Sequence, residues 1–269
     1  MSDTQDQAED QNLEQDLKLS EGAKSQVEKK SAQEKKKQDT SDGIAKLSEY
    51  DIEISTRLEN YDSGVVAAYK ASRKKERGNF IAYVSEPHLV PRHNKVEVYQ
   101  GFVNPNIARL VRHGTIYWPP AKQERYVFIY EDNMGAKLMQ EGEEQALGFK
   151  NDIVMERILK PFAGILQDFR DRDFVHGSIR ASNIYNGGSN NLKRIVLGDC
   201  LSAPSGYNQN AQYEPIDRAM ADPNARGPGT QPTDMYAFGV MLAVMLRQHD
   251  PMHGLSNGEI IRRKIDIEF

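Results

Sequence analysis

The chain has 269 residues, 38% of them hydrophobic, which suits one or two domains and is low for a chain packed from end to end. Its formal charge of −4 gives no reason to expect nucleic acid or an anionic membrane as a partner. Because Cys200 is its only cysteine, it can form neither an intrachain disulfide nor a thiolate cluster for a metal.

Residues 1–46 are predicted to be a disordered tail. They lack aromatic residues and consist mainly of Lys, Glu, Gln, Ser and Asp, so they cannot bury enough apolar surface to offset their ordering entropy. A docking arm around Leu13, Leu17 and Leu19, or at the basic run KKSAQEKKK, is the alternative. The N-terminus is acidic where a signal peptide is positive, and no apolar run approaches the ~18 residues of a membrane span. We therefore expect a cytoplasmic protein.

Residues 48–132 are predicted to form a small β-rich lobe. Three runs, GVVAAYKA, NFIAYVSE and ERYVFIYE, are rich in β-branched and aromatic residues, which is typical of antiparallel strands. Between the last two, Pro91 and Pro105 leave room for only one short helix.

Residues 133–269 are predicted to be mainly helical. A helical repeat of apolar residues contains Pro161, which must begin or kink a helix there. The segment DMYAFGVMLAVMLRQ is apolar nearly all round and predicts a fully buried helix, and NGEIIRRKI predicts one further helix. The residues of the repeat are Ile153, Ile158, Phe162, Leu166 and Phe169.

Four stretches occur in the order found in eukaryotic-like protein kinases. VNPNIARLVRHG resembles the segment after helix C, YVFIYEDNMGAKL the fifth strand and hinge, FVHGSIRASNIY the catalytic loop, and PTDMYAFGVML the start of helix F. IVLGDCLSA falls where the metal-binding DFG lies, and Ser178 and Asn183 are spaced like the Asp and Asn of H-R-D-x-x-x-x-N.

The chain thus resembles a degenerate member of this superfamily, of the bacterial Ser/Thr type, over residues 50–269. The resemblance implies an α+β, bilobal fold. Its N-lobe would be a small antiparallel sheet with one short helix, and its C-lobe mainly helical and abridged at the chain end.

Phosphoryl transfer needs a glycine-rich loop over the phosphates and a strand lysine held by a helix-C glutamate. Where the resemblance places that loop there is only Gly64, and the strand lysine becomes Val84. Lys70 and Lys74 lie in a charged run, where solvated surface is the expected role.

The helix-C glutamate falls near Lys95, with Glu97 two residues away on another side of any helix. We therefore expect the Lys–Glu pair of the family to be absent.

In the catalytic loop His176 matches the family's histidine, Gly177 replaces its arginine, and Ser178 replaces its aspartate. A serine hydroxyl stays neutral near pH 7, and losing a positioned base typically costs about 10²- to 10⁴-fold in rate. Without the arginine, phosphates in the activation loop lack their usual partner. The hydroxyls concerned are those of Ser202, Ser205, Tyr207 and Tyr213.

Other groups are retained. The resemblance implies that Arg180 supplies a cation and that Asn183 and Asp199 are metal ligands, so ATP and Mg²⁺ are the cofactors it would allow. Asp199 as an ordinary turn or capping residue is the alternative, because Cys200 and Leu201 follow it where DFG has Phe and Gly.

Two residues are expected to be structural: His176 as a support of the loop, and Asp234 as an acceptor of backbone hydrogen bonds from it. A hydrolase built on His176 and Ser178 is disfavoured, because HGSIR is not G-x-S-x-G and no orienting acid is indicated.

Because the lost groups act on one transition state, the sequence favours a pseudokinase that serves as a protein-interaction or allosteric module, with or without bound ATP. It would bind a protein partner. The alternatives are an atypical kinase or nucleotidyl transferase that uses relocated groups, or a scaffold that binds no ligand. The relocated groups would be Asp173, Asp199, Asn183 and Arg180.

Overall fold

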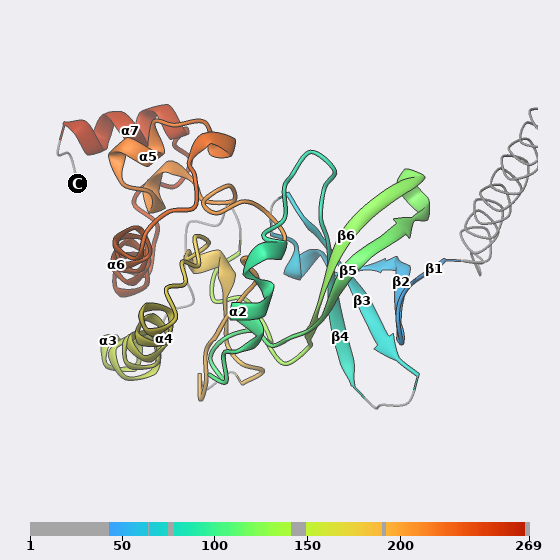
Figure 1. The fold of residues 1–269 in the computed structure, drawn as a ribbon. Helices are drawn as coiled ribbons and strands as arrows, with labels where there is room; N and C mark the ends of the chain where they lie inside the picture. The colour runs from blue at the N-terminus through green and yellow to red at the C-terminus, as the bar shows by residue number, and fades with distance from the viewer. Residues whose placement is uncertain (1–42, 64, 75–77, 141–148, 190–191, 267–269) are drawn as a thin grey trace, which may run out of the picture. The chain divides into compact units, whose positions relative to one another are not determined.

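The computed structural model describes residues 43–63, 65–74, 78–140, 149–189 and 192–266. Six antiparallel strands form one sheet in the order β1-β2-β3-β4-β6-β5 (Figure 1). The strands predicted from the sequence correspond to β3, β4 and β6 and are confirmed, whereas β1, β2 and β5 were not predicted. The strands are β1 (Ile44–Leu47), β2 (Tyr50–Arg57), β3 (Ala67–Arg73), β4 (Asn79–Val84), β5 (Leu110–Trp118) and β6 (Gln123–Glu131).

The predicted tail extends too far, because residues 44–46 belong to strand β1. Ile44 pairs with Glu53 and Leu47 with Tyr50 across the β1–β2 hairpin. Ala45 and Leu47 are buried, so this strand contributes to the core despite its charged surroundings in the sequence. Residues 1–42, the rest of the predicted tail, lie outside the described residues.

The predicted short helix between Pro91 and Pro105 is α2 (Val96–Gln100), preceded by a 3₁₀ turn (His93–Lys95). Its buried residues Val96 and Tyr99 pack into the main core. We call residues 44–131, which hold the sheet and α2, the N-lobe.

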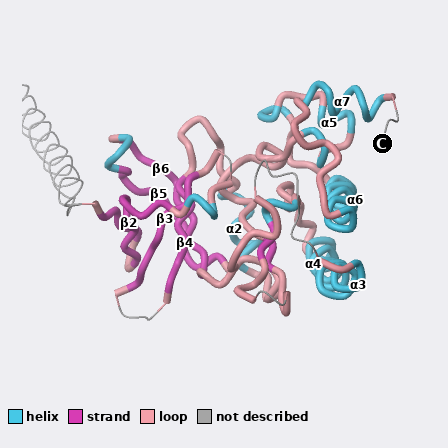
Figure 2. Tube along the Cα trace, turned by 180° about the vertical axis from the view of Figure 1, so that it is seen from behind, coloured by secondary structure: helices cyan, strands magenta, loops and turns pink. Residues whose placement is uncertain are grey.

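We call the described residues from 132 onward the C-lobe, and helices are its main regular elements, as predicted (Figure 2). Pro161 lies in the first turn of α4, directly after a π-helical turn (Met155–Leu159), so the backbone passes the missing amide donor without breaking the helical run. The helices are α3 (Asn151–Val154), α4 (Lys160–Asp171), α5 (Ile216–Ala219), α6 (Gln231–Arg247) and α7 (Asn257–Ile265), and a two-stranded sheet joins β7 (Ile184–Tyr185) to β8 (Val196–Leu197).

Helix α6 begins with a capping box between Thr230 and Thr233, and Pro232 occupies its first turn, where a missing amide donor costs nothing. The prediction that this helix is fully buried is wrong. Ala237, Phe238 and Met241 are buried, but Met235 is 54% exposed. The apolar residues all round the helix therefore do not all face the core of the described chain.

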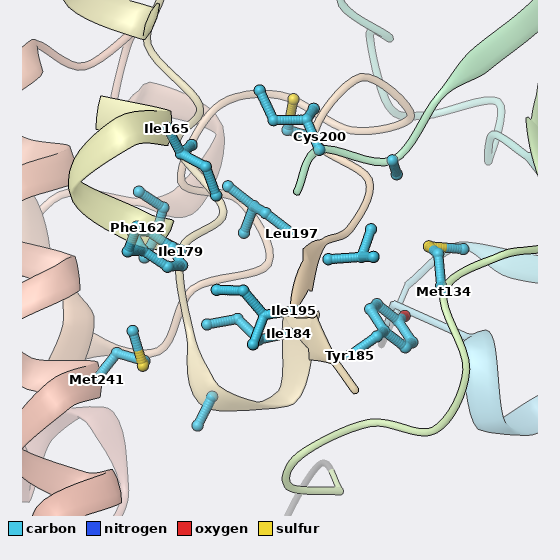
Figure 3. Close-up of a cluster of buried hydrophobic side chains, with 14 of the residues drawn as sticks. Met134, Phe162, Ile165, Ile179, Ile184, Tyr185, Ile195, Leu197, Cys200 and Met241 are labelled. Carbon is cyan, nitrogen blue, oxygen red and sulfur yellow. The ribbon is translucent and has the colours of Figure 1, made fainter. Parts of the chain in front are cut away.

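The main core extends from one face of the six-stranded sheet to the helices of the C-lobe, and part of it lies around the loop of residues 176–183. Figure 3 shows Phe162 and Ile165 of α4 close to Ile179, with Leu197 and Ile184 from the small sheet in the same cluster. This packing fixes the loop between helix and sheet. None of the described helices combines the length and the apolar character that a membrane crossing requires.

Candidate functional site in the cleft between the lobes

Asp234 anchors the loop that resembles a catalytic loop. It lies in the first turn of α6, and its two carboxylate oxygens accept backbone N–H bonds from His176 (2.6 Å) and Gly177 (2.8 Å). Burial raises the pKa of Asp234 to about 6, although these two hydrogen bonds act in the opposite direction. The carboxylate is therefore positioned as a support for the backbone, as the resemblance implies.

His176 is fully buried and supports the same loop. Its ring stacks on Phe169, its Nδ1 lies 3.2 Å from the amide of Ser178, and its Nε2 lies 3.2 Å from the carbonyl of Gly198. Burial, together with the nearby charge of Arg92, lowers the pKa of His176 to about 3. The ring is thus neutral, with Nδ1 accepting and Nε2 donating.

Ser178 lies where the family has its catalytic aspartate, and its hydroxyl is already engaged. Arg180 Nη1 donates to Ser178 Oγ at 2.6 Å, and Arg180 Nε donates to Ser182 at 3.0 Å. Asn183 Nδ2 donates to the carbonyls of Ser178 (2.8 Å) and Asp199 (3.0 Å). Arg180 and Asn183 are each 2% exposed. The structure therefore brings these residues together in contacts with one another, and Arg180 and Ser182 also line a cavity of about 280 Å³.

Asp199 is 3% exposed and both of its carboxylate oxygens are occupied. Oδ1 accepts the Tyr130 hydroxyl (2.6 Å) and the Leu201 amide (3.0 Å). Oδ2 accepts the amide (3.3 Å) and the hydroxyl of Ser202. Burial raises the pKa of Tyr130 well above its ordinary value, so its hydroxyl keeps the proton that it donates. Asp199 thus caps a turn and also ties that turn to the N-lobe.

The register of β4 differs from the prediction. Phe80, Ala82 and Val84 pack in the cluster on one face of the sheet, whereas Ile81 and Tyr83 join the main core on the other face. The residue that β4 turns toward Asp199 is therefore Tyr83, not Val84. Because β4 is buried on both faces, its apolar run carried no alternation from which the register could be predicted.

The other candidate cations lie outside this cleft. Lys70 is half-exposed and pairs with Glu53 (3.4 Å), and Lys74 is exposed. Glu97 is exposed on α2 and Lys95 is partly exposed in the turn before it. Within the described residues, no ion pair is found between β4 and α2. Gly64 lies outside the described residues.

Tyrosine side chains line the space between β4 and β7. Burial raises the pKa of Tyr83 and of Tyr185, and each of these side chains also influences the pKa of the other. Tyr83 packs edge-on against Tyr130, with ring centroids 5.6 Å apart, and Tyr61 stacks on Tyr185, also at 5.6 Å. Sequence analysis missed this cluster, because its members are distributed over four separate segments.

Arg92 links the lobes and was also missed. From the segment before α2, its guanidinium donates to the carbonyls of Val175 (2.5 Å), His176 (2.6 Å) and Cys200 (3.1 Å), and its backbone amide donates to Leu201 (2.8 Å). The side chain is buried, and its charge lowers the pKa of His176. The only signal in the sequence was an arginine after a proline, which no rule connects to a loop 83 residues away.

The segment after Asp199 packs closely on the catalytic loop. Gly177 has φ = +67°, a Cβ there would overlap the Ser205 hydroxyl, and the Gly206 amide donates to the Gly177 carbonyl at 2.7 Å. Ser205 thus occupies the space that the Cβ of the family's arginine would need at position 177. Of the four hydroxyls considered for phosphorylation, those of Ser202, Ser205 and Tyr213 belong to buried residues, and Tyr207 is half-buried.

These contacts do not fit Mg²⁺ or a nucleotide phosphate. A metal ligand needs a free oxygen, and each oxygen of Asp199 accepts two hydrogen bonds. A strand lysine would neutralise phosphate, and the residue in its place is a neutral tyrosine. In the part of the chain that the structure describes, no three His, Cys, Asp or Glu side chains converge as a metal site.

Neither a protein-family model nor a curated protein sequence matches the chain. Solved structures do. One is Rad53 1-466 in complex with AMP-PNP, with a TM-score of 0.56, 16% identity, and 80% of this chain and 52% of that chain covered. Another is PK-1, a kinase of Cydia pomonella granulovirus, with a TM-score of 0.55, 17% identity, and 80% and 78% covered. This chain thus spans about half the length of the Rad53 structure. The fold is that of the protein kinases, as the sequence resemblance implied.

Proposed function

We propose that the chain is a pseudokinase: a kinase-like module that binds a protein partner and does not transfer phosphate. The observation that carries this proposal is the state of Ser178 and Asp199. Ser178 supplies a neutral hydroxyl held by Arg180, and the Asp199 carboxylate is saturated by Tyr130, Leu201 and Ser202. No group among them is available as a base or as a metal ligand without breaking buried hydrogen bonds.

Exposed apolar residues around α2 support a role in protein binding. Val90 before the helix is 71% exposed and Val103 after it is 92% exposed. The partner surface that we propose is therefore the helix-C region. We also propose a cytoplasmic location, which suits the single buried thiol of Cys200.

Transfer assays test the first half of the proposal. The chain is incubated with Mg²⁺ and ATP labelled in either the α- or the γ-phosphate, with generic protein substrates and with itself. We expect no incorporation above that of Asp199→Ala. Label incorporation that disappears in Asp199→Ala would establish the atypical kinase or the nucleotidyl transferase instead, using Asp199, Asn183 and Arg180. Asp173 is exposed on a turn after α4, apart from these buried groups.

Binding of ATP without transfer is tested separately, by calorimetry with Mg²⁺ and ATP. Occupancy through Arg180, Asn183 and Asp199 requires Asp199 to exchange Tyr130 and Ser202 for the metal, so we expect no binding at millimolar nucleotide. Binding without label transfer would keep the pseudokinase and add a nucleotide to it.

A capture experiment tests the second half. Val90→Asp and Val103→Asp place charges on either side of α2, and Met220→Asp, at a residue that is 66% exposed, is the matched control in the C-lobe. We expect a specific partner to be lost from both α2-side variants and retained by the control. Equal capture by all three variants would place the partner surface elsewhere.

A further inference from the structure

A continuous set of aromatic contacts runs from the loop after β2 to Asp199. Tyr61 lies at the end of a 3₁₀ turn (Glu59–Tyr61), and its ring stacks on Tyr185 with an interplanar angle of 17°. Tyr185 and Tyr83 lie in the same core, close enough for each to influence the pKa of the other, Tyr83 packs on Tyr130, and Tyr130 donates to Asp199. Side chains of this protein thus bridge the two lobes along the whole path.

Tyr61 has the contacts of a bound planar ligand. One face of its ring stacks on Tyr185 in β7, which is 1% exposed. The backbone of Tyr185 forms an antiparallel β-bridge with that of Lys137. At the other end, its hydroxyl donates to Asp132, directly after β6, at 3.3 Å. A flat ring stacked on one lobe, with a polar edge at the crossing between the lobes, is the arrangement in which proteins hold small aromatic molecules.

The neighbouring Asp62 holds the Tyr61 loop in this position. Its carbonyl accepts Lys137 Nζ (2.8 Å), and its carboxylate accepts the Ala68 amide (2.7 Å) and Arg57 Nε (2.8 Å). Lys137 is 7% exposed, so the link to the C-lobe is shielded from water. Asp62 thus connects the loop to β3 and to the C-lobe. These contacts hold the backbone next to Tyr61 and so hold the Tyr61 ring on Tyr185.

We propose that Tyr61 fills, from within the chain, a site for a planar aromatic ring on Tyr185, and that truncating Tyr61 opens this site to a free aromatic molecule. The inference rests on the proposed pseudokinase and adds to it the reason why the cleft takes no ligand. The class of ligand for the opened site is a neutral planar ring with one hydrogen-bond donor, because Tyr185 offers a stacking face and Asp132 an acceptor.

The test is chemical rescue of Tyr61→Ala, with p-cresol as the probe because it reproduces the missing side chain. The control is Tyr69→Ala, which removes a partly buried tyrosine that packs on Trp118 in the other cluster. We expect p-cresol at ~10 times its Kd to raise the Tm of Tyr61→Ala by about 3–6 °C. The wild type, Tyr61→Phe and Tyr69→Ala should shift by under about 1 °C at the same concentration.

Adenine and Mg²⁺ with ATP are tested in parallel on the wild type and Tyr61→Ala. Adenine should stabilise only Tyr61→Ala. If that variant does not fold, Tyr61→Leu, which also removes the ring, takes its place. Equal shifts in Tyr61→Ala and Tyr69→Ala, or none in either, would overturn the inference. A wild-type shift with ATP but no label transfer would also overturn it while leaving the pseudokinase intact, whereas label transfer by the wild type would refute the proposed function itself.

Discussion

Replacing Arg92 by Met is expected to cost more stability than any surface substitution, because one side chain satisfies three carbonyls of the other lobe. The carbonyls of His176 and Cys200 belong to buried residues and lose their donor in the variant. Leaving a buried acceptor unpaired costs about 1–3 kcal/mol, so two of them give about 2–6 kcal/mol. Burial raises the pKa of Asp234, and the nearby charge of Arg92 opposes that rise, so the variant also loses a favourable electrostatic interaction with this carboxylate. We therefore expect a loss of about 3–5 kcal/mol, which lies inside the range given by the two carbonyls.

The assay is urea unfolding at pH 7, with thermal unfolding as a check. For a chain of this size the loss corresponds to a Tm lower by about 6–20 °C. Arg109→Met is the control, since the Arg109 side chain is 73% exposed and pairs with Glu131 at 3.1 Å, for which we expect under about 1 kcal/mol. A loss below about 1 kcal/mol in Arg92→Met would show that the carbonyls find other donors, and the role assigned to Arg92 would be wrong.

Three further predictions address the catalytic loop. Gly177→Arg, which restores the residue of the family, should destabilise the fold by about 2–5 kcal/mol, because Gly177 has a positive φ and a side chain there overlaps with Ser205. The control Gly188→Ala, where φ is +77° and the space around the Cβ is open, should cost only the ~1–2 kcal/mol of backbone strain. Equal losses of stability in unfolding experiments would exclude the overlap with Ser205. The pKa of His176 is lowered from 6.5 to about 3, so its contribution to the free energy of unfolding is complete above pH 6.5 and is lost as the pH falls toward 3, by an amount on the order of 4–5 kcal/mol. Asp234 acts in the opposite sense. Its pKa is raised from 3.8 to about 6, so its contribution to the free energy of unfolding is lost as the pH rises through that range. His176→Gln should therefore take up about one proton fewer on unfolding between pH 3 and 6.5, measured from urea midpoints across that range, and an unchanged pH dependence would show that His176 is protonated in the fold. Tyr130→Phe removes a hydrogen bond to a buried carboxylate and should cost about 1.5–3 kcal/mol in urea unfolding, and a change below about 0.5 kcal/mol would mean that Ser202 and Leu201 alone satisfy Asp199.

The parts of the fold that could be predicted are those that depend on residues close together in the sequence. The helical repeat around Pro161 and the apolar segment from Asp234 depend on residues a few positions apart, and helices α4 and α6 cover them. The spacing of Ser178 and Asn183 likewise identified the loop that resembles a catalytic loop, because both residues belong to one short stretch of the sequence.

The parts that were not predictable depend on contacts between distant segments. Strand β5 follows a Pro-containing stretch, and its pairing with β6 is decided by long-range packing rather than by its own residues. The same holds for the one-residue error between Val84 and Tyr83. The hydrogen bond from Tyr130 to Asp199 joins residues 69 positions apart, so a family motif at either end gave no sign of it.

The links between the lobes have a consequence for the thermodynamics of recognition. Arg92, Tyr130 and Ser85 each join the N-lobe to the segment from Val175 to Ser202, with Ser85 Oγ donating to the Ser202 carbonyl at 2.9 Å. A partner that contacts both lobes therefore meets one fixed arrangement and loses little affinity to ordering the module. A small molecule bound far from that surface changes the partner's affinity only if it binds more tightly to an arrangement in which these links are broken.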